Sequence, residues 1–199
     1  MVPGFVYTKD HSPSSPEEAK QMKKTPYCKA IGSLIYIAVA MRPDIVFIVS
    51  ALLEFLSNLG RVHWEAVKCI FKYLSGMKTL ELTYSSKQHS LKGYTDAEGA
   101  TQVHHHAMSG YAFLIDRGAV SWSSRKQELV TLSTAEAEYV AATHIAKEAI
   151  WLRKLIGKLF PNFLTLTPLH CYNQATLKLA TDDNYHVRTE HIDICSHND

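Results

Sequence analysis

The fold is decided by three short stretches, LKGYTDA at 91–97, GYAFLI at 110–115 and AVSWS at 119–123. Each is rich in β-branched and aromatic residues, a composition typical of β-strands. Arg117-Gly118 separates the last two stretches and predicts a tight turn, so these two strands should form a hairpin. The sequence therefore predicts a strand followed by a β-hairpin.

A long helix is predicted directly after the hairpin. Ser133 or Thr134 is suited to cap its start, and apolar residues then recur at helical spacing until Pro161 ends it. A short strand over 166–172 and a short helix over 173–180 should follow. Strands, helix, strand and helix in this order indicate an α/β fold with one mixed sheet.

The chain before this region has a different pattern. Residues 27–80 predict a small cluster of three helices, and Trp64, Val67, Phe71 and Leu74 form an apolar stripe along the third. The stripe fits core packing, with a groove for a partner as the alternative. Residues 1–26 are expected to be a linker or approach segment, since 8–26 hold three prolines, three serines and no apolar period.

Composition excludes several classes of protein. Lys and Arg number 21 against 19 Asp and Glu, so the formal net charge of +2 does not by itself indicate a nucleic-acid partner. The four cysteines lack zinc-site spacing, and no signal peptide or membrane-length apolar run is present. We therefore expect reduced, buried thiols in an intracellular, cytoplasmic protein without a membrane partner.

Two carboxylates are the candidates for chemistry. Asp96 lies at the end of a predicted strand and Glu138 near the start of the long helix. Carboxylates from a strand and a helix that meet at one sheet edge can bind Mg²⁺, and two such ions can activate water for phosphodiester cleavage. The alternative is that both are solvated surface groups.

Longer stretches resemble the Pol polyprotein of copia-type LTR retrotransposons. They include SLIYIAVAMRPDI at 33–45, HWEAVKCIFKYLSG at 63–76, GYTDAEG at 93–99, LSTAEAEYVAA at 132–142 and HVRTEHIDI at 186–194. The region resembled is the C-terminal end of the reverse transcriptase, over 27–80, followed by the ribonuclease H domain, over 81–199. The resemblance implies an α/β, ribonuclease H-like mixed sheet preceded by a helical cluster.

Ribonucleases H of this family cut the RNA strand of an RNA–DNA hybrid with two Mg²⁺ ions held by four acids. Asp96 matches the first acid and Glu138 the second, with Glu136 as the runner-up. The third falls on Tyr172, which is uncharged at pH 7. The fourth belongs to a final helix beyond another strand, and the sequence ends at Asp199, so a C-terminally truncated domain is expected.

The resemblance also implies contacts to nucleic acid. Asn173 and Gln174 match an amide pair that faces the minor groove of the hybrid. Ser124 and Arg125, flanked by Ser123 and Lys126, are suited to phosphate, although a polar turn explains the serines equally well. His104, His105 and His106 replace the family's arginine-rich turn, and a drifted loop is favoured over a metal site.

We therefore expect a retrotransposon-derived ribonuclease H-like chain whose catalysis has degenerated. Its expected partners are an RNA–DNA hybrid or another nucleic acid and the remainder of a Pol polyprotein, in a virus-like particle of the ancestral element. A working nuclease would need a substitute carboxylate such as Glu98 or Asp193. Two further hypotheses are a non-catalytic nucleic-acid binder and a protein-interaction remnant. The sequence does not specify the oligomeric state.

Overall fold

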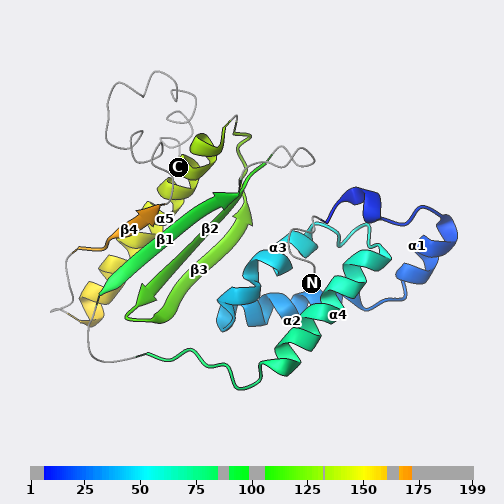
Figure 1. Ribbon diagram of the computed structural model, residues 1–199, viewed down its shortest axis with the longest axis horizontal. Coiled ribbons are helices and arrows are strands. Elements are labelled where there is room, and N and C mark those ends of the chain that lie inside the picture. The colour runs from blue at the N-terminus through cyan, green and yellow to red at the C-terminus, as the bar shows by residue number, and fades with distance from the viewer. Residues whose placement is uncertain (1–6, 85–89, 99–105, 132, 161–165, 172–199) are drawn as a thin grey trace. The chain divides into compact units, whose positions relative to one another are not determined.

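The structure, a computed structural model, describes residues 7–84, 90–98, 106–131, 133–160 and 166–171. The chain divides into two compact units, residues 1–82 and 83–199. The first is built from helices, and the second from a sheet with a long helix (Figure 1). No helix in these described ranges is both long and apolar enough to cross a membrane.

The helices of the first unit follow the predicted order closely. Three α-helices lie within residues 27–80, as predicted. The elements are η1 (Lys9–His11), α1 (Pro16–Met22), α2 (Tyr27–Ala40), η2 (Pro43–Ile45), α3 (Val46–Leu53) and α4 (Arg61–Gly76).

Helix α1 lies inside the segment that the sequence predicted to be a linker. The Ser15 hydroxyl accepts a hydrogen bond from the Glu18 backbone N–H at 3.2 Å, and Pro16 occupies the first helical position. No residue of α1 is buried. The helix therefore has no apolar stripe from which it could have been predicted, and its capping residues are its only sequence signal.

The predicted stripe of α4 is confirmed in part, because Val67 is buried in the core of the first unit and Trp64 and Leu74 pack against that core. His63, Ala66, Val67 and Ile70 are buried, whereas Phe71 is 39% exposed. The predicted core stripe is thus wrong at Phe71. His63 is buried but polar, so a search for apolar residues omits it and includes Phe71 instead.

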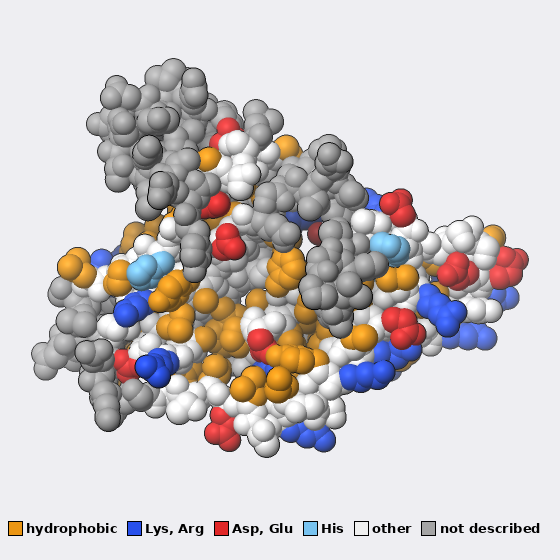
Figure 2. Space-filling model, viewed as in Figure 1, with side chains coloured by type: hydrophobic (Ala, Val, Ile, Leu, Met, Phe, Trp, Pro, Cys, Tyr) orange, Lys and Arg blue, Asp and Glu red, His pale blue; other side chains and the backbone are white. Residues whose placement is uncertain are grey.

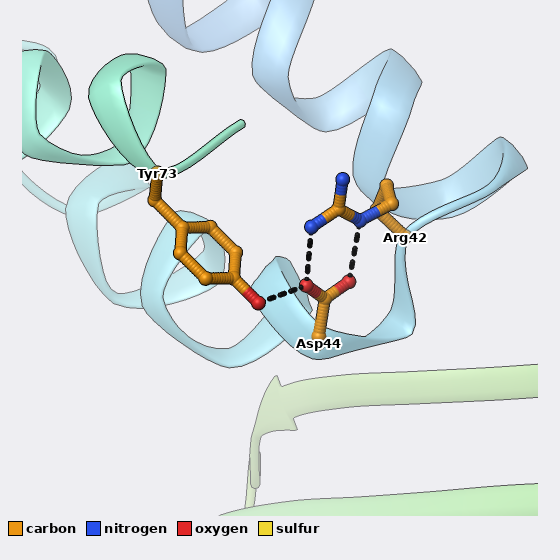
Figure 3. A network of polar contacts seen from close by, with 3 residues as sticks. All are labelled: Arg42, Asp44 and Tyr73. Atoms are coloured by element: carbon orange, nitrogen blue, oxygen red, sulfur yellow. Dashed lines mark hydrogen bonds and ion pairs between the residues drawn. The ribbon is translucent and has the colours of Figure 1, made fainter. Parts of the chain in front are cut away.

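A polar network fixes the junction between α2 and η2 against α4 (Figure 3). The Arg42 guanidinium donates two hydrogen bonds to the Asp44 carboxylate, at 2.9 and 2.7 Å. The Tyr73 hydroxyl donates a third to the same carboxylate at 2.8 Å, and the guanidinium lies over the Tyr73 ring. The Arg42 hydrogen bonds hold the pKa of Asp44 below its usual value.

The second unit contains a four-stranded mixed sheet, which confirms the predicted α/β class. Its order is β3-β2-β1-β4, with β1–β2 and β2–β3 antiparallel and β4 parallel to β1. The predicted hairpin turn is displaced by one residue, because Gly118 pairs with Ile115 and leaves Asp116-Arg117 as the turn. The strands are β1 (Leu91–Glu98), β2 (Met108–Ile115), β3 (Gly118–Lys126) and β4 (Leu169–Cys171).

Helix α5 (Thr134–Leu159) packs against one face of this sheet. The Ser133 hydroxyl accepts a hydrogen bond from the Glu136 backbone N–H at 3.2 Å, which confirms the predicted N-cap. Gly93 allows a close approach to the helix, since a Cβ there would lie 3.0 Å from Ile145. The core between helix and sheet contains Leu91, Phe113, Ile145, Ala149, Leu152 and Ile156.

Candidate functional site

Asp96 lies on the face of the sheet that is turned away from α5, here called the distal face. Alternate residues of β1 point to opposite sides, and Leu91 and Gly93 contact the α5 side. Tyr94 and Asp96 therefore belong to the distal face, where both are exposed. Figure 1 draws α5 behind the strands, so Figure 2 shows the distal face, with hydrophobic side chains gathered over the strands.

The distal face gives Asp96 a polar neighbour on β3. Gly110 of β2 pairs with Asp96 on one side and with Ser124 of β3 on the other. Directly paired residues of adjacent strands share a face, so Asp96 and Ser124 lie in one row with Gly110 between them. Because glycine has no side chain, nothing in this row separates the carboxylate from the hydroxyl.

Glu138 lies in the second turn of α5 and is only 8% exposed. The Cys171 thiol donates a hydrogen bond to the Glu138 carboxylate, with 3.4 Å between Sγ and Oε2. Cys171 in turn pairs with Thr95, the residue directly before Asp96. One residue of β4 thus connects the carboxylate of α5 with the strand position next to Asp96.

Small side chains bring the first turns of α5 to this end of the sheet. Ala137 and Ala141 of α5 form a buried cluster with Ala97 of β1 and Ala107, which precedes β2. Ala141, three residues after Glu138, is 2% exposed. Alanines allow the helix and strands to approach closely, and this approach places Glu138 beside the sheet.

Gln127 is a part of the site that the sequence did not predict. Its side chain is buried, and its amide nitrogen donates to Ser109 Oγ at 2.5 Å and to the Ala137 carbonyl at 2.7 Å. Its backbone N–H donates to the Ala107 carbonyl at 2.8 Å. Gln127 therefore joins both hairpin strands to the residue before Glu138. In the sequence, Gln127 is recognisable only as a polar residue that directly follows a predicted strand.

The predicted phosphate contacts on β3 do not form one cluster. Ser121 hydrogen bonds to Glu148 of α5 at 2.8 Å, so its side of β3 faces the helix. Ser123 and Arg125 share that side by strand alternation, whereas Ser124 lies on the distal face with Asp96. Adjacent residues of a strand point in opposite directions, and this separates Ser124 from Arg125.

Several predicted site residues lie outside the described ranges. They are Tyr172, Asn173 and Gln174 and the first two histidines of the triple-histidine loop, His104 and His105. Within the described ranges, no three His, Cys, Asp or Glu side chains are grouped to hold a metal ion. Asp96 and Glu138 alone do not make the two-metal site that the resemblance implies, so no chemical step is assigned to Mg²⁺.

The cysteine thiols differ in their surroundings. Cys28 is exposed, which corrects the expectation of buried thiols, while Cys69 and Cys171 are partly buried. These three cysteines carry thiols and form no disulfide with one another. Of the three, Cys171 donates to a carboxylate of the candidate site.

Comparisons with known proteins place the chain among transposon sequences. It is 42% identical over 191 residues to the retrovirus-related Pol polyprotein from transposon TNT 1-94 of Nicotiana tabacum, covering 96% of this chain and 14% of the polyprotein. A secreted RxLR effector protein 161 of Plasmopara viticola is 39% identical over 133 residues, covering 66% of this chain and 94% of the effector. The Pol polyprotein from transposon RE1 of Arabidopsis thaliana is 31% identical, covering 87% of this chain and 12% of the polyprotein. No family model and no solved structure matches.

The fold and the polar residues define an α/β unit whose carboxylates lie at one end of a mixed sheet. Two of these relatives are retrovirus-related Pol polyproteins, and each of the two matches extends over most of this chain. The chain is thus similar to one segment of the retrovirus-related Pol polyproteins of transposons, in agreement with the copia-type motifs. It spans about a seventh of the length of the tobacco polyprotein.

Proposed function

We propose that the second unit is a ribonuclease H-like domain that binds RNA–DNA hybrids but no longer cleaves them. The observation that carries the proposal is the Cys171 hydrogen bond to Glu138, next to the Thr95 pairing that leads to Asp96. This hydrogen bond places Glu138 at the end of the sheet where Asp96 lies, with Glu138 on the α5 side and Asp96 on the distal face. Ser124, in the row of Asp96, adds a hydroxyl suited to phosphate.

The proposed loss of cleavage rests on the identity of residue 172. Tyr172 comes directly after Cys171, at the position of the family's third acid. A tyrosine brings no negative charge at pH 7, so it cannot share a metal ion with Asp96 and Glu138 as a carboxylate would. Hydrolysis that needs two Mg²⁺ ions would therefore lack a ligand, while contacts to the nucleic-acid backbone would remain.

The test is a cleavage and binding assay on the whole chain with a labelled RNA–DNA hybrid. We expect the wild type to bind without cleaving in Mg²⁺, and Tyr172→Asp to cleave slowly. Asp96→Asn added to Tyr172→Asp should abolish that cleavage. Wild-type cleavage that Asp96→Asn removes would contradict the loss of hydrolysis. Failure to bind would contradict the domain assignment, and an inactive Tyr172→Asp chain would show that Tyr172 is not the cause.

A second candidate function is a non-catalytic role as a separate protein, away from the rest of a Pol polyprotein. It is favoured by the effector of Plasmopara viticola, 94% of whose length this chain matches. If the chain instead acts within a polyprotein, the remaining 86% of a protein like that of tobacco would be its partner. A chain that folds cooperatively but binds no hybrid would support the separate role.

A further inference from the structure

Three basic side chains from two elements of the second unit converge at the surface. Arg125 lies near the end of β3, and His144 and Lys147 lie on α5. All three residues are exposed. Positions three apart on a helix are neighbours on one face, so His144 and Lys147 lie side by side.

The packing of β3 against α5 brings Arg125 to the two helical residues. The Ser121–Glu148 hydrogen bond fixes β3 beside the helix, and Arg125 is on the same side of the strand as Ser121. Partial desolvation of the imidazole lowers the pKa of His144, and the positive charges of Arg125 and Lys147 lower it further. Gln127 hydrogen bonds to Ala137 and Ser121 to Glu148, so Arg125 lies along the stretch of α5 between these two residues, which contains His144 and Lys147.

The positive charge of this cluster is not neutralised by an ion pair within the described ranges. The two ion pairs found there, Arg42–Asp44 and Lys68–Glu65, both belong to the first unit. Glu128 acts on His144 with the opposite sign, but its influence is smaller than that of the cations. Glu148 accepts the hydrogen bond from Ser121. Two carboxylates, Glu128 and Glu148, thus lie near the cluster, and its exposed cations Arg125 and Lys147 are the groups that can meet an anion.

We propose that Arg125, His144 and Lys147 form a binding surface for the phosphodiester backbone of an RNA–DNA hybrid. The inference rests on the proposed function and extends it, because this surface lies on the α5 side of β3, opposite Ser124 and Asp96. Arg125 can donate two parallel hydrogen bonds to a phosphate, and Lys147 supplies a point charge. Backbone contacts of this kind fix position and carry no sequence information.

The first experiment measures binding of the whole chain to a fluorescent hybrid at increasing salt. Each of Arg125→Ala and Lys147→Ala should weaken binding by about three- to tenfold at low salt and reduce the slope of log K against log salt by about one. Lys158→Ala is the matched control, since Lys158 is also exposed on α5, near its end. It should leave affinity and slope unchanged.

The second experiment uses His144, which a bound phosphate should favour in its protonated form. Wild-type affinity should rise from pH 7.5 to pH 6 more than the affinity of His144→Gln. The charged groups that act on His144 are Arg125, Lys147 and Glu128, and none of these is changed in the variant.

The outcomes separate this inference from the function on which it rests. A wild-type chain that binds no hybrid contradicts the proposed function and the surface together. A wild type that binds, with Arg125→Ala and Lys147→Ala indistinguishable from Lys158→Ala, contradicts the surface alone. Circular dichroism melts confirm that each variant is folded, as expected for substitutions at exposed positions. Equal losses on duplex DNA would show that the surface recognises the backbone of any duplex.

Discussion

At the scale of single residues, Gln127 connects the hairpin with the helix that carries Glu138. Its buried amide connects Ser109 of β2 with the carbonyl of Ala137 in α5. Ser109 and Ala137 are both buried, so water cannot freely replace these hydrogen bonds when they are lost. The position of Glu138 thus depends on a neutral residue outside its own element.

Gln127→Leu should destabilise the second unit. The substitution leaves the Ser109 hydroxyl and the Ala137 carbonyl without this donor, which costs about 1–3 kcal/mol of unfolding free energy. Urea denaturation measures the loss, and Glu128→Gln at the exposed neighbouring position serves as the control. Adding Ser109→Ala to Gln127→Leu should restore part of the stability, because one buried polar group is then removed. Equal midpoints for Gln127→Leu and wild type would contradict this role.

Asp44→Asn should destabilise the first unit by about 0.5–1 kcal/mol, since it replaces a solvent-exposed carboxylate that accepts three hydrogen bonds from Arg42 and Tyr73. The Arg42 hydrogen bonds hold the folded-state pKa of Asp44 below its usual value. The stability that the Asp44 charge contributes is therefore complete at pH values above the usual Asp pKa. It is lost as the pH falls through the lower pKa of Asp44 in the folded state.

The measurement for Asp44 is urea denaturation at pH 7 and again at acidic pH. Glu65→Gln is the control, because its ion pair with Lys68 is exposed and should add no measurable stability. The difference between wild type and Asp44→Asn should shrink as the pH is lowered into the range where Asp44 becomes protonated. A difference that stays constant would contradict the role of its charge.

At the scale of elements, the fit of β1 under α5 depends on Gly93. A Cβ at this position would lie 2.6 Å from Leu169, 2.7 Å from Phe113 and 3.0 Å from Ile145. These three side chains come from β4, β2 and α5, so a change at Gly93 affects the contacts of β1 with all three elements.

Gly93→Ala should lower the unfolding free energy of the second unit by about 1–3 kcal/mol through overpacking. Gly110→Ala is the matched control within the same sheet, because the nearest atom to its Cβ would be 3.8 Å away. Thermal unfolding compares the two variants. Similar melting temperatures for Gly93→Ala and Gly110→Ala would contradict the close packing at Gly93.

The elements show where sequence patterns were sufficient. Strand and helix positions in the second unit were predicted because alternation and helical spacing have different periods. The carboxylates were found because the motif around each resembles a known family. Gln127 was missed because one polar residue at a strand end has no period. The phosphate cluster was predicted as contiguous because proximity in sequence was taken as proximity in space, although alternation divides Ser124 from Arg125.

At the scale of the whole molecule, the two units differ in their buried ionisable groups. The first contains His63, which has no exposed surface and stacks on Phe55 with ring centroids 3.9 Å apart. Its Nδ1 accepts a hydrogen bond from the Gly60 backbone N–H at 3.0 Å. Among the described residues of the second unit, the histidine with a lowered pKa is His144, which is exposed and therefore screened by solvent.

The first unit should consequently be the part of the chain that mild acid destabilises. Burial lowers the pKa of His63, and the nearby charge of His11 lowers it further, with a smaller opposing effect from the backbone of Thr8. A histidine with a lowered folded-state pKa contributes its full stability above the ordinary value near 6.5 and loses it as pH falls below that value. Protonation of Nδ1 would also place a second N–H donor opposite the Gly60 N–H, so the hydrogen bond between them would be lost.

Tryptophan fluorescence can assign the acid effect to one unit, because Trp64 belongs to the first and Trp122 and Trp151 to the second. In a chain carrying Trp122→Phe and Trp151→Phe, the urea midpoint reported by Trp64 should fall between pH 7.5 and pH 5.5. In a Trp64→Phe chain the midpoint should change less. His63→Gln should remove the pH dependence seen by Trp64, whereas His170→Gln, at an exposed position of β4, should preserve it. If the midpoint reported by Trp64 still depends on pH in His63→Gln, the acid-sensitive group lies elsewhere in the first unit. If only the midpoint reported by Trp122 and Trp151 depends on pH, that group lies in the second unit.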